Sequence, residues 1–296
     1  MASLNREILK QYKKGRKELA TSFNKWTRSI RFIGANKLKQ LQAGEITQKD
    51  YAGWLEKQLM HAGWAHNMMN ELTGILQKAD KGAVQSIDKA VPKVYSDTEF
   101  KTLYAIDKSV GISANFTLQN ERAVEAAMKR KLLPHVDEAK NAKWNYRRLS
   151  SAITQGIVQG DSIPDIAKRI EHVGVANGKA AIRTARTATN AAENAGKFEA
   201  YKEAEELGLE ITKIWLATVD DRTRDSHVLM DGEEVGIDEE FSNGLMYPCD
   251  PDGNDEEVYN CRCRMITRCN GQEIDMSGRS NKTGMSYEEW KDAHRR

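Results

Sequence analysis

Reactive side chains are concentrated in the last third of the chain, between Trp215 and Cys269. This stretch contains all four cysteines of the protein, one of its six histidines and two closely spaced arginines. Thiolate sulfur and imidazole nitrogen are common protein ligands of zinc. A tetrahedral site is therefore chemically reasonable, with these four ligands: His227, Cys249, Cys261 and Cys263. The spacing is not that of paired Cys-x-x-Cys zinc sites, so the thiols could instead pack as small apolar groups, and Cys269 could replace Cys249.

The same stretch also permits catalytic chemistry. Asp220, Asp221 and His227 could hold a divalent ion in a metal-dependent nuclease or transferase. A cysteine and a histidine could also form a nucleophile pair. No glycine-rich phosphate loop or paired-carboxylate frame accompanies these residues, and Arg222 and Arg224 are as able to hold the acidic loops together. We therefore expect binding rather than catalysis, with the nuclease or transferase as the alternative.

A change of hydrophobic period predicts how these side chains are positioned. Residues 211–219 are rich in β-branched and aromatic residues, which favours a strand. The Asp231-Gly232 pair predicts a turn, and residues 257–265 are a candidate last strand. In that strand Cys261 and Cys263 would face the same side, because alternate residues of a strand do so.

The chain before this stretch is helical in its pattern. Residues 4–32 predict a basic amphipathic helix that ends at Gly34, and residues 50–80 give the clearest helical period. Further helices are expected at 119–133, 136–159, 163–170 and 179–207, whereas residues 81–118 look like short segments. Thr47, Ser162 and Ser286 are in position to cap helices, and Gly174 and Gly178 are expected to break the chain.

These elements predict a mainly α-helical N-terminal region followed by a small α+β C-terminal module. We place the helical region at residues 1–150, the module at 151–270, and a tail with a short helix at 271–296. No apolar run approaches the roughly 20 residues of a membrane span, and the N-terminus lacks the apolar core of a secretory signal. We therefore expect a cytoplasmic site of synthesis, where thiols stay reduced and can bind metal.

The net charge of +2 conceals a strong polarity. Residues 1–40 carry eleven bases against two acids, whereas residues 201–260 carry eighteen acids against four bases. A basic arm suggests an anionic partner, and nucleic acid is the leading candidate, although a solvated helix face is an equally simple explanation. The residues expected to contact nucleic acid are Lys10, Lys13, Lys14, Arg16, Lys17, Arg28 and Arg31.

An ordered set of residues resembles the signature of the phage Mu F-like head morphogenesis family, the minor capsid proteins of tailed phages. The set comprises Trp215, Asp220, Arg222, Arg224, His227, Asp231, Gly232 and Asn260, with the Asn260-Cys261-Arg262-Cys263 string at its end. The resemblance covers about residues 150–270. Two positions depart from the family pattern: Cys249 stands where glycine is usual, and Ala188 stands where a glutamate often follows Ala-Arg-Thr.

The resemblance implies a structural virion component, present in few copies inside the head near the portal. Such proteins assist head assembly, and some bind DNA and influence its exit. The implied partners are the portal protein and other head proteins, with double-stranded DNA as a further partner suggested by the basic arm. The implied location is the head interior, and the host cytoplasm during assembly. A DNA-binding protein outside any virion is a third interpretation.

Overall fold

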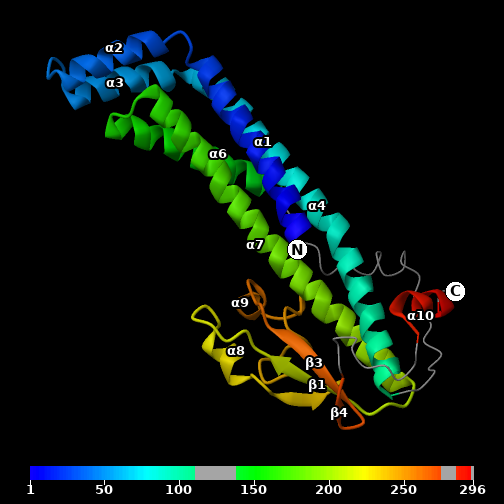
Figure 1. The fold of residues 1–296 in the computed structure, drawn as a ribbon. Helices are drawn as coiled ribbons and strands as arrows, with labels where there is room; N and C mark the ends of the chain where they lie inside the picture. The colour runs from blue at the N-terminus through cyan, green and yellow to red at the C-terminus, as the bar shows by residue number, and fades with distance from the viewer. Residues whose placement is uncertain (111–137, 275–284, 295–296) are drawn as a thin grey trace. The chain divides into compact units, whose positions relative to one another are not determined.

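A computed structural model describes residues 1–110, 138–274 and 285–294, and helices dominate it (Figure 1). The helices are α1 (Ala2–Trp26), α2 (Arg31–Gln42), α3 (Gln48–Leu59), α4 (Ala62–Val110), α6 (Glu138–Gln159), α7 (Ile163–Glu206), α8 (Asp225–Leu229), α9 (Asp255–Val258) and α10 (Tyr287–His294). The strands are β1 (Ile211–Leu216), β2 (Glu234–Gly236), β3 (Arg264–Cys269) and β4 (Gln272–Glu273). The predicted fold class, helices followed by a small α+β module, is confirmed. In the described part of the chain, no helix is long and apolar enough to cross a membrane.

The chain forms two compact units, and neither is continuous in sequence. The helical unit combines Ala2–Ser86 with His135–Ile182, and the mixed unit combines Met1, Ile87–Pro134 and Arg183–Arg296. The long helices α4 and α7 therefore contribute residues to both units. The predicted division of the chain at residue 150 remains a prediction.

The helical unit is held by one apolar core. Its buried residues recur at three- and four-residue spacing, which places them on one stripe of each helix. Representative members with at most 2% of their surface exposed are Leu19, Phe23, Tyr51, Leu55, Leu59, Met68, Leu72, Leu149, Ile153, Ile163 and Ile166. They come from α1, α3, α4, α6 and α7, so each of these helices turns its apolar stripe inward. The predicted cap of α3 is confirmed: Thr47 and Asp50 form a reciprocal capping box.

Two predicted helices are interrupted. The helix expected over residues 4–32 ends at Trp26, where the Thr27 hydroxyl donates a hydrogen bond of 2.8 Å to the carbonyl of Phe23, and a new helix begins at Arg31. The helix expected over 50–80 is likewise divided between α3 and α4. The apolar period continues across both interruptions because the flanking helices bury the same core. Periodicity reports which residues are buried, not whether the backbone is continuous.

Three glycines expected to end or break helices lie inside them instead. Gly34 is in α2, and Gly174 and Gly178 are in α7, which continues without a break. A Cβ at Gly174 would come within 2.8 Å of Arg16 Cγ, and one at Gly178 within 3.3 Å of the Tyr12 ring. These glycines therefore allow α1 to approach α7 closely. The predicted cap at the start of α7 is confirmed, because the Asp165 N–H donates a hydrogen bond to the Ser162 hydroxyl.

Residues 81–110, expected to form short segments, instead continue α4 as one helix with Pro92 inside it. The helix predicted at residues 119–133 lies outside the described residues. In the mixed unit, Gly196 of α7 lies directly against α4: a Cβ there would be 2.6 Å from the carbonyl oxygen of Tyr95. This contact buries Glu99 beside Glu199 and Glu203, and burial together with their negative charges raises the pKa of Glu99 to about 8.

The mixed unit contains an antiparallel four-stranded sheet in the order β2-β1-β3-β4. The strand predicted over residues 211–219 is confirmed as β1, which lies at the centre and pairs with β3 over six residues. The last strand, predicted at residues 257–265, is wrong in position: β3 begins at Arg264, and residues 255–258 form the helical turn α9. Four acidic or amide residues, 254–257, favour a capped helical turn there, and Asn254 accepts a hydrogen bond from the Glu256 N–H.

The C-terminal helix α10 docks onto α4 within the mixed unit. Ser286 and Glu289 form the predicted capping box, with the Ser286 N–H donating to Glu289 at 2.8 Å and the Glu289 N–H donating to the Ser286 hydroxyl. Trp290 is buried, and its indole N–H donates a 2.7 Å hydrogen bond to Asp107 of α4. This tryptophan therefore anchors the C-terminal helix to α4.

Candidate functional site

His227 of α8 is the centre of the candidate site. Only 1% of its surface is exposed, and its ring lies edge-on to Trp215 of β1, with the ring centres 5.3 Å apart. Trp215 makes a second edge-on contact of 5.2 Å with Phe241. The central strand therefore supplies a rigid aromatic wall against which the imidazole is fixed.

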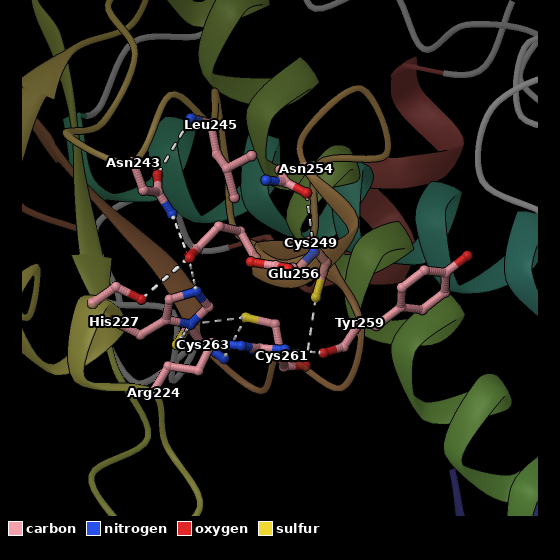
Figure 2. Close-up of polar contacts among 12 residues, drawn as sticks. Arg224, His227, Asn243, Leu245, Cys249, Asn254, Glu256, Tyr259, Cys261 and Cys263 are labelled. Carbon is pink, nitrogen blue, oxygen red and sulfur yellow. Dashed lines mark hydrogen bonds and ion pairs between the residues drawn. The ribbon is translucent and has the colours of Figure 1, made fainter.

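The two ring nitrogens of His227 face different groups. Nε2 lies 2.6 Å from Oε2 of Glu257, and Glu257 also accepts a hydrogen bond of 3.3 Å from the Ser226 hydroxyl and one of 3.5 Å from the Asn243 amide. Nδ1 faces two sulfur atoms, 3.6 Å from Cys261 Sγ and 3.3 Å from Cys263 Sγ (Figure 2). Burial opposes protonation of His227, yet hydrogen bonds with Cys263 and Glu257 leave its pKa above the ordinary value.

Cys261 and Cys263 precede β3 and are not part of a strand, so the expected alternation of a strand does not bring them together. A loop does so instead: the Cys263 N–H donates to Cys261 Sγ at 3.4 Å. The pKa of Cys261 is raised to about 12 by its contact with Cys249, and that of Cys263 to about 12 by its contact with Cys261. Among the described residues, the ligand atoms of His227, Cys261 and Cys263 all lie within 4.8 Å of one another, a group that could hold a metal ion.

The other two cysteines lie outside this group. Cys249 Sγ contacts the carbonyl of Cys261 at 3.4 Å and the amide of Asn190 at 3.3 Å, and Figure 2 shows it on the opposite side of Cys261 from His227. Cys249 has a φ of 66°, a backbone conformation that favours glycine. Cys269 pairs with Ile211 at the far end of β3. The structure thus brings together three of the four expected ligands.

Asp220 is bound to the Asn-Cys-Arg-Cys string through Arg262. Both carboxylate oxygens contact the guanidinium, and the backbone N–H of Arg222 donates to Oδ1 at 2.9 Å. These contacts, the one to Arg262 first, hold the pKa of Asp220 far below its ordinary value. Arg224 donates to the carbonyl of Tyr259 (Figure 2), whereas Asp221 is exposed. Asp220 and Asp221 therefore do not join His227 in one cluster.

The remaining predicted motif residues shape turns at the end of the sheet. The Asp231 carboxylate accepts a 2.8 Å hydrogen bond from the Ala217 N–H, and Gly232 has a φ of 83° and donates to the Trp215 carbonyl. Asn260 has a φ of 61°, and its N–H donates to the Thr187 hydroxyl of α7 at 3.2 Å. Gly232 and Asn260 thus occupy backbone conformations that their residue types tolerate best.

Residues 147–266 match a family model described as Phage Mu protein F like protein. These residues of the chain therefore form a phage Mu F-like domain. The resemblance seen in the ordered motif residues is thereby confirmed.

Three known proteins show similarity to the chain. NAD(+)--arginine ADP-ribosyltransferase EFV of Enterococcus faecalis (strain ATCC 700802 / V583) is 30% identical over 240 residues, which is 76% of this chain and 48% of that protein. Minor head protein GP7 of Bacillus phage SPP1 is 25% identical over 268 residues, 81% of each chain. Uncharacterized protein YqbB of Bacillus subtilis (strain 168) is 30% identical over 122 residues, 39% of each. The chain thus spans about half the length of the first of these relatives. No solved structure matched the chain.

Within the Mu F-like domain, side chains that sequence reasoning missed attach α7 to the sheet and its loops. Asn190 donates to the carbonyls of Cys261 and Cys263 at 3.2 and 3.0 Å. Asn194 donates to the carbonyls of Pro248 and Cys263 and accepts from the N–H of Met265. Lys197 continues this row by donating to the Met265 carbonyl at 2.8 Å. The sequence signal was present: three polar residues at i, i+4 and i+7 on an alanine-rich helix share one face.

Glu257 is a further residue of the Mu F-like site that the sequence did not single out. It is one of eighteen acids between residues 201 and 260, and composition cannot tell which of them contacts the histidine. Asn254 caps the short helix α9 that carries Glu257, and so fixes its direction toward His227.

The predicted nucleic-acid-binding residues lie in the helical unit. Lys10, Lys13, Lys14 and Lys17 are exposed and follow the i, i+3, i+4, i+7 spacing of a single helix face; we call them the lysine stripe. Arg28, between α1 and α2, and Arg31, the first residue of α2, are both exposed. Arg16 differs from these residues, because it is partly buried and its Nη2 lies 3.7 Å from Oε2 of Glu171.

Proposed function

We propose that this protein is a minor capsid protein of a tailed phage that acts in head morphogenesis, inside the head near the portal. The observation that carries the proposal is the combination of the Mu F-like domain with similarity to the SPP1 minor head protein over 81% of both chains. A match of that extent includes the helices before the module as well as the module itself.

The chemistry of the module supports a binding role. The Asp220 carboxylate is held by Arg262, and His227 is buried against Trp215, so neither is presented to a substrate in this structure. Both instead join distant segments of the module. The activity in the name of the E. faecalis relative belongs to that protein, of which this chain spans less than half.

A direct test is co-purification with the portal protein of the phage that encodes this chain. We expect the two proteins to co-elute from a size-exclusion column when they are produced together. A D220N/R262Q double variant removes the carboxylate–guanidinium pair of the mixed unit and changes no residue of the helical unit. Its elution with or without the portal protein therefore tests which of the two units binds the portal. Separate elution of the native chain and the portal protein would contradict portal association.

We further propose that the lysine stripe of α1 contacts the phosphate backbone of packaged double-stranded DNA. The four ammonium groups are exposed on one helix face, and only Lys14 has an acidic neighbour, Glu18 at 4.0 Å, in the described contacts of the stripe. Backbone contacts of this kind need charge density rather than base recognition.

The measurement is the salt dependence of binding to a DNA duplex. Replacing all four lysines of the stripe with glutamine should weaken binding and reduce the slope of log K against log salt by about three to four, because each phosphate contact contributes roughly 0.9. The matched control replaces four exposed lysines on α3 and α4: Lys57, Lys78, Lys93 and Lys101. If both quadruple variants lose the same affinity for the duplex, net charge and not the lysine stripe determines DNA binding.

A further inference from the structure

The geometry points to a zinc site formed by Nδ1 of His227 and the sulfurs of Cys261 and Cys263. These three atoms lie within 4.8 Å of one another, and their residues are 1–2% exposed. The site is independent of the proposed function, because it follows from contacts within the module and not from its partners.

The two nitrogen–sulfur distances are close to those around a tetrahedral zinc ion. Zn–S bonds of about 2.3 Å and Zn–N bonds of about 2.0–2.1 Å place nitrogen and sulfur ligands roughly 3.6 Å apart at the tetrahedral angle. In the structure, His227 Nδ1 is 3.6 Å from Cys261 Sγ and 3.3 Å from Cys263 Sγ. The two observed distances therefore lie within about 0.3 Å of those expected around a bound zinc ion.

The second ring nitrogen of His227 is arranged as in known metal sites. A metal-binding histidine donates its other N–H to a carboxylate or carbonyl, which fixes the tautomer and the direction of the ring. Oε2 of Glu257 lies 2.6 Å from Nε2 and is the acceptor for this N–H. With the proton on Nε2, Nδ1 carries a lone pair and lies within 3.6 Å of both sulfurs. Ser226 and Asn243 hydrogen-bond to Glu257 and hold the carboxylate in place.

The ligand set selects the metal. Two sulfurs and one imidazole favour zinc over magnesium or calcium, which bind oxygen ligands. Cys249 is not assigned as a ligand, because its sulfur lies outside the group and contacts Asn190 and the Cys261 carbonyl. Three protein ligands leave one corner of the tetrahedron for an exogenous ligand.

A bound ion would connect α8 to the loop before β3. His227 and Cys263 are 36 residues apart in sequence, and the ion would add metal–ligand bonds beside the Asp220–Arg262 pair, which binds the same loop to the segment before α8. Loss of zinc should therefore loosen the loop that α7 binds through Asn190 and Asn194.

The test is metal analysis of the full-length protein, purified without chelator and then equilibrated with zinc and dialysed. We expect one zinc per chain, lost in C261S and in C263S, and retained in C249G and C269S, the control thiol at the far end of β3. Replacement by cobalt should give the near-ultraviolet thiolate-to-cobalt absorption of a sulfur-ligated tetrahedral ion. E257Q is a milder variant that keeps all three ligands, and its zinc affinity should fall about 10–100-fold.

Each outcome decides the proposal. A wild-type chain without stoichiometric zinc, or a C263S variant that folds and keeps its zinc, would overturn the site. Loss of zinc in C249G would overturn the three-ligand assignment in favour of the set that includes Cys249. None of these results affects portal association or DNA binding, so failure of this inference is distinguishable from failure of the proposed function.

Discussion

Replacing Asn194 with alanine tests how α7 holds the sheet and loops of the Mu F-like domain. The Asn194 side chain makes three hydrogen bonds: to the carbonyls of Pro248 and Cys263 at 3.0 and 3.2 Å, and from the N–H of Met265 at 3.1 Å. The side chain is 1% exposed, so alanine would leave these partners without water. A net value of about 0.5–1.5 kcal/mol for each hydrogen bond gives a loss of roughly 3 kcal/mol.

The assay is native-state hydrogen exchange of the amide of Met265, together with denaturant unfolding. A loss of about 3 kcal/mol should speed exchange at Met265 by roughly two powers of ten, since about 1.4 kcal/mol corresponds to a factor of ten. N194D should be at least as damaging, because a carboxylate cannot donate to the two carbonyls. R186A, at an exposed position of the same helix, is the control. Unchanged exchange at Met265 in N194A would refute this account of the attachment.

Three further predictions concern burial, close packing and charge. Relative to the native chain, E99Q should have a larger free energy of unfolding, and the difference should grow to about 5 kcal/mol as pH rises from 4.5 to about 8. The reason is that the folded state penalises ionisation of this buried carboxyl. Equal stability of E99Q and the native chain in urea titrations at pH 8 would contradict this prediction. G196A should lower the urea midpoint by the equivalent of about 1–3 kcal/mol, since its Cβ would approach the Tyr95 carbonyl; a midpoint at the native value would show that α4 and α7 can separate without cost. D220N should lower stability at neutral pH, and the difference should shrink as pH falls below 3.8, because the pKa of Asp220 is depressed by Arg262; a pH-independent difference would exclude this cause.

Local signals in the sequence predicted local structure well. The caps at Thr47, Ser162 and Ser286 depend on side chains within three residues, and all three are present. The β-branched run of β1 was equally readable, because a central strand buried on its inner face selects such residues.

Tertiary contacts account for the errors. Gly174 and Gly178 were expected to break a helix, because conformational freedom is the only property of glycine that a single sequence displays. In the structure they allow close approach of α1. A sequence cannot distinguish these two uses of glycine when the neighbouring helix is unknown.

The candidate site was only partly readable for a similar reason. Clustering in sequence singled out His227, Cys261 and Cys263, which lie together in the structure, although a loop and not a strand brings the thiols together. Glu257 and Asn194 were not singled out, because their roles depend on contacts over 30 and 69–71 residues of sequence. Such contacts leave no local pattern.

The central claim is that this protein is a component of the phage head. The most direct measurement is quantitative mass spectrometry of purified particles of the phage that encodes it, compared with particles from a mutant lacking the gene. The account predicts a few copies of the chain per native particle, and defective heads or reduced infectivity in the mutant. Absence of the chain from native particles, with normal heads in the mutant, would contradict it.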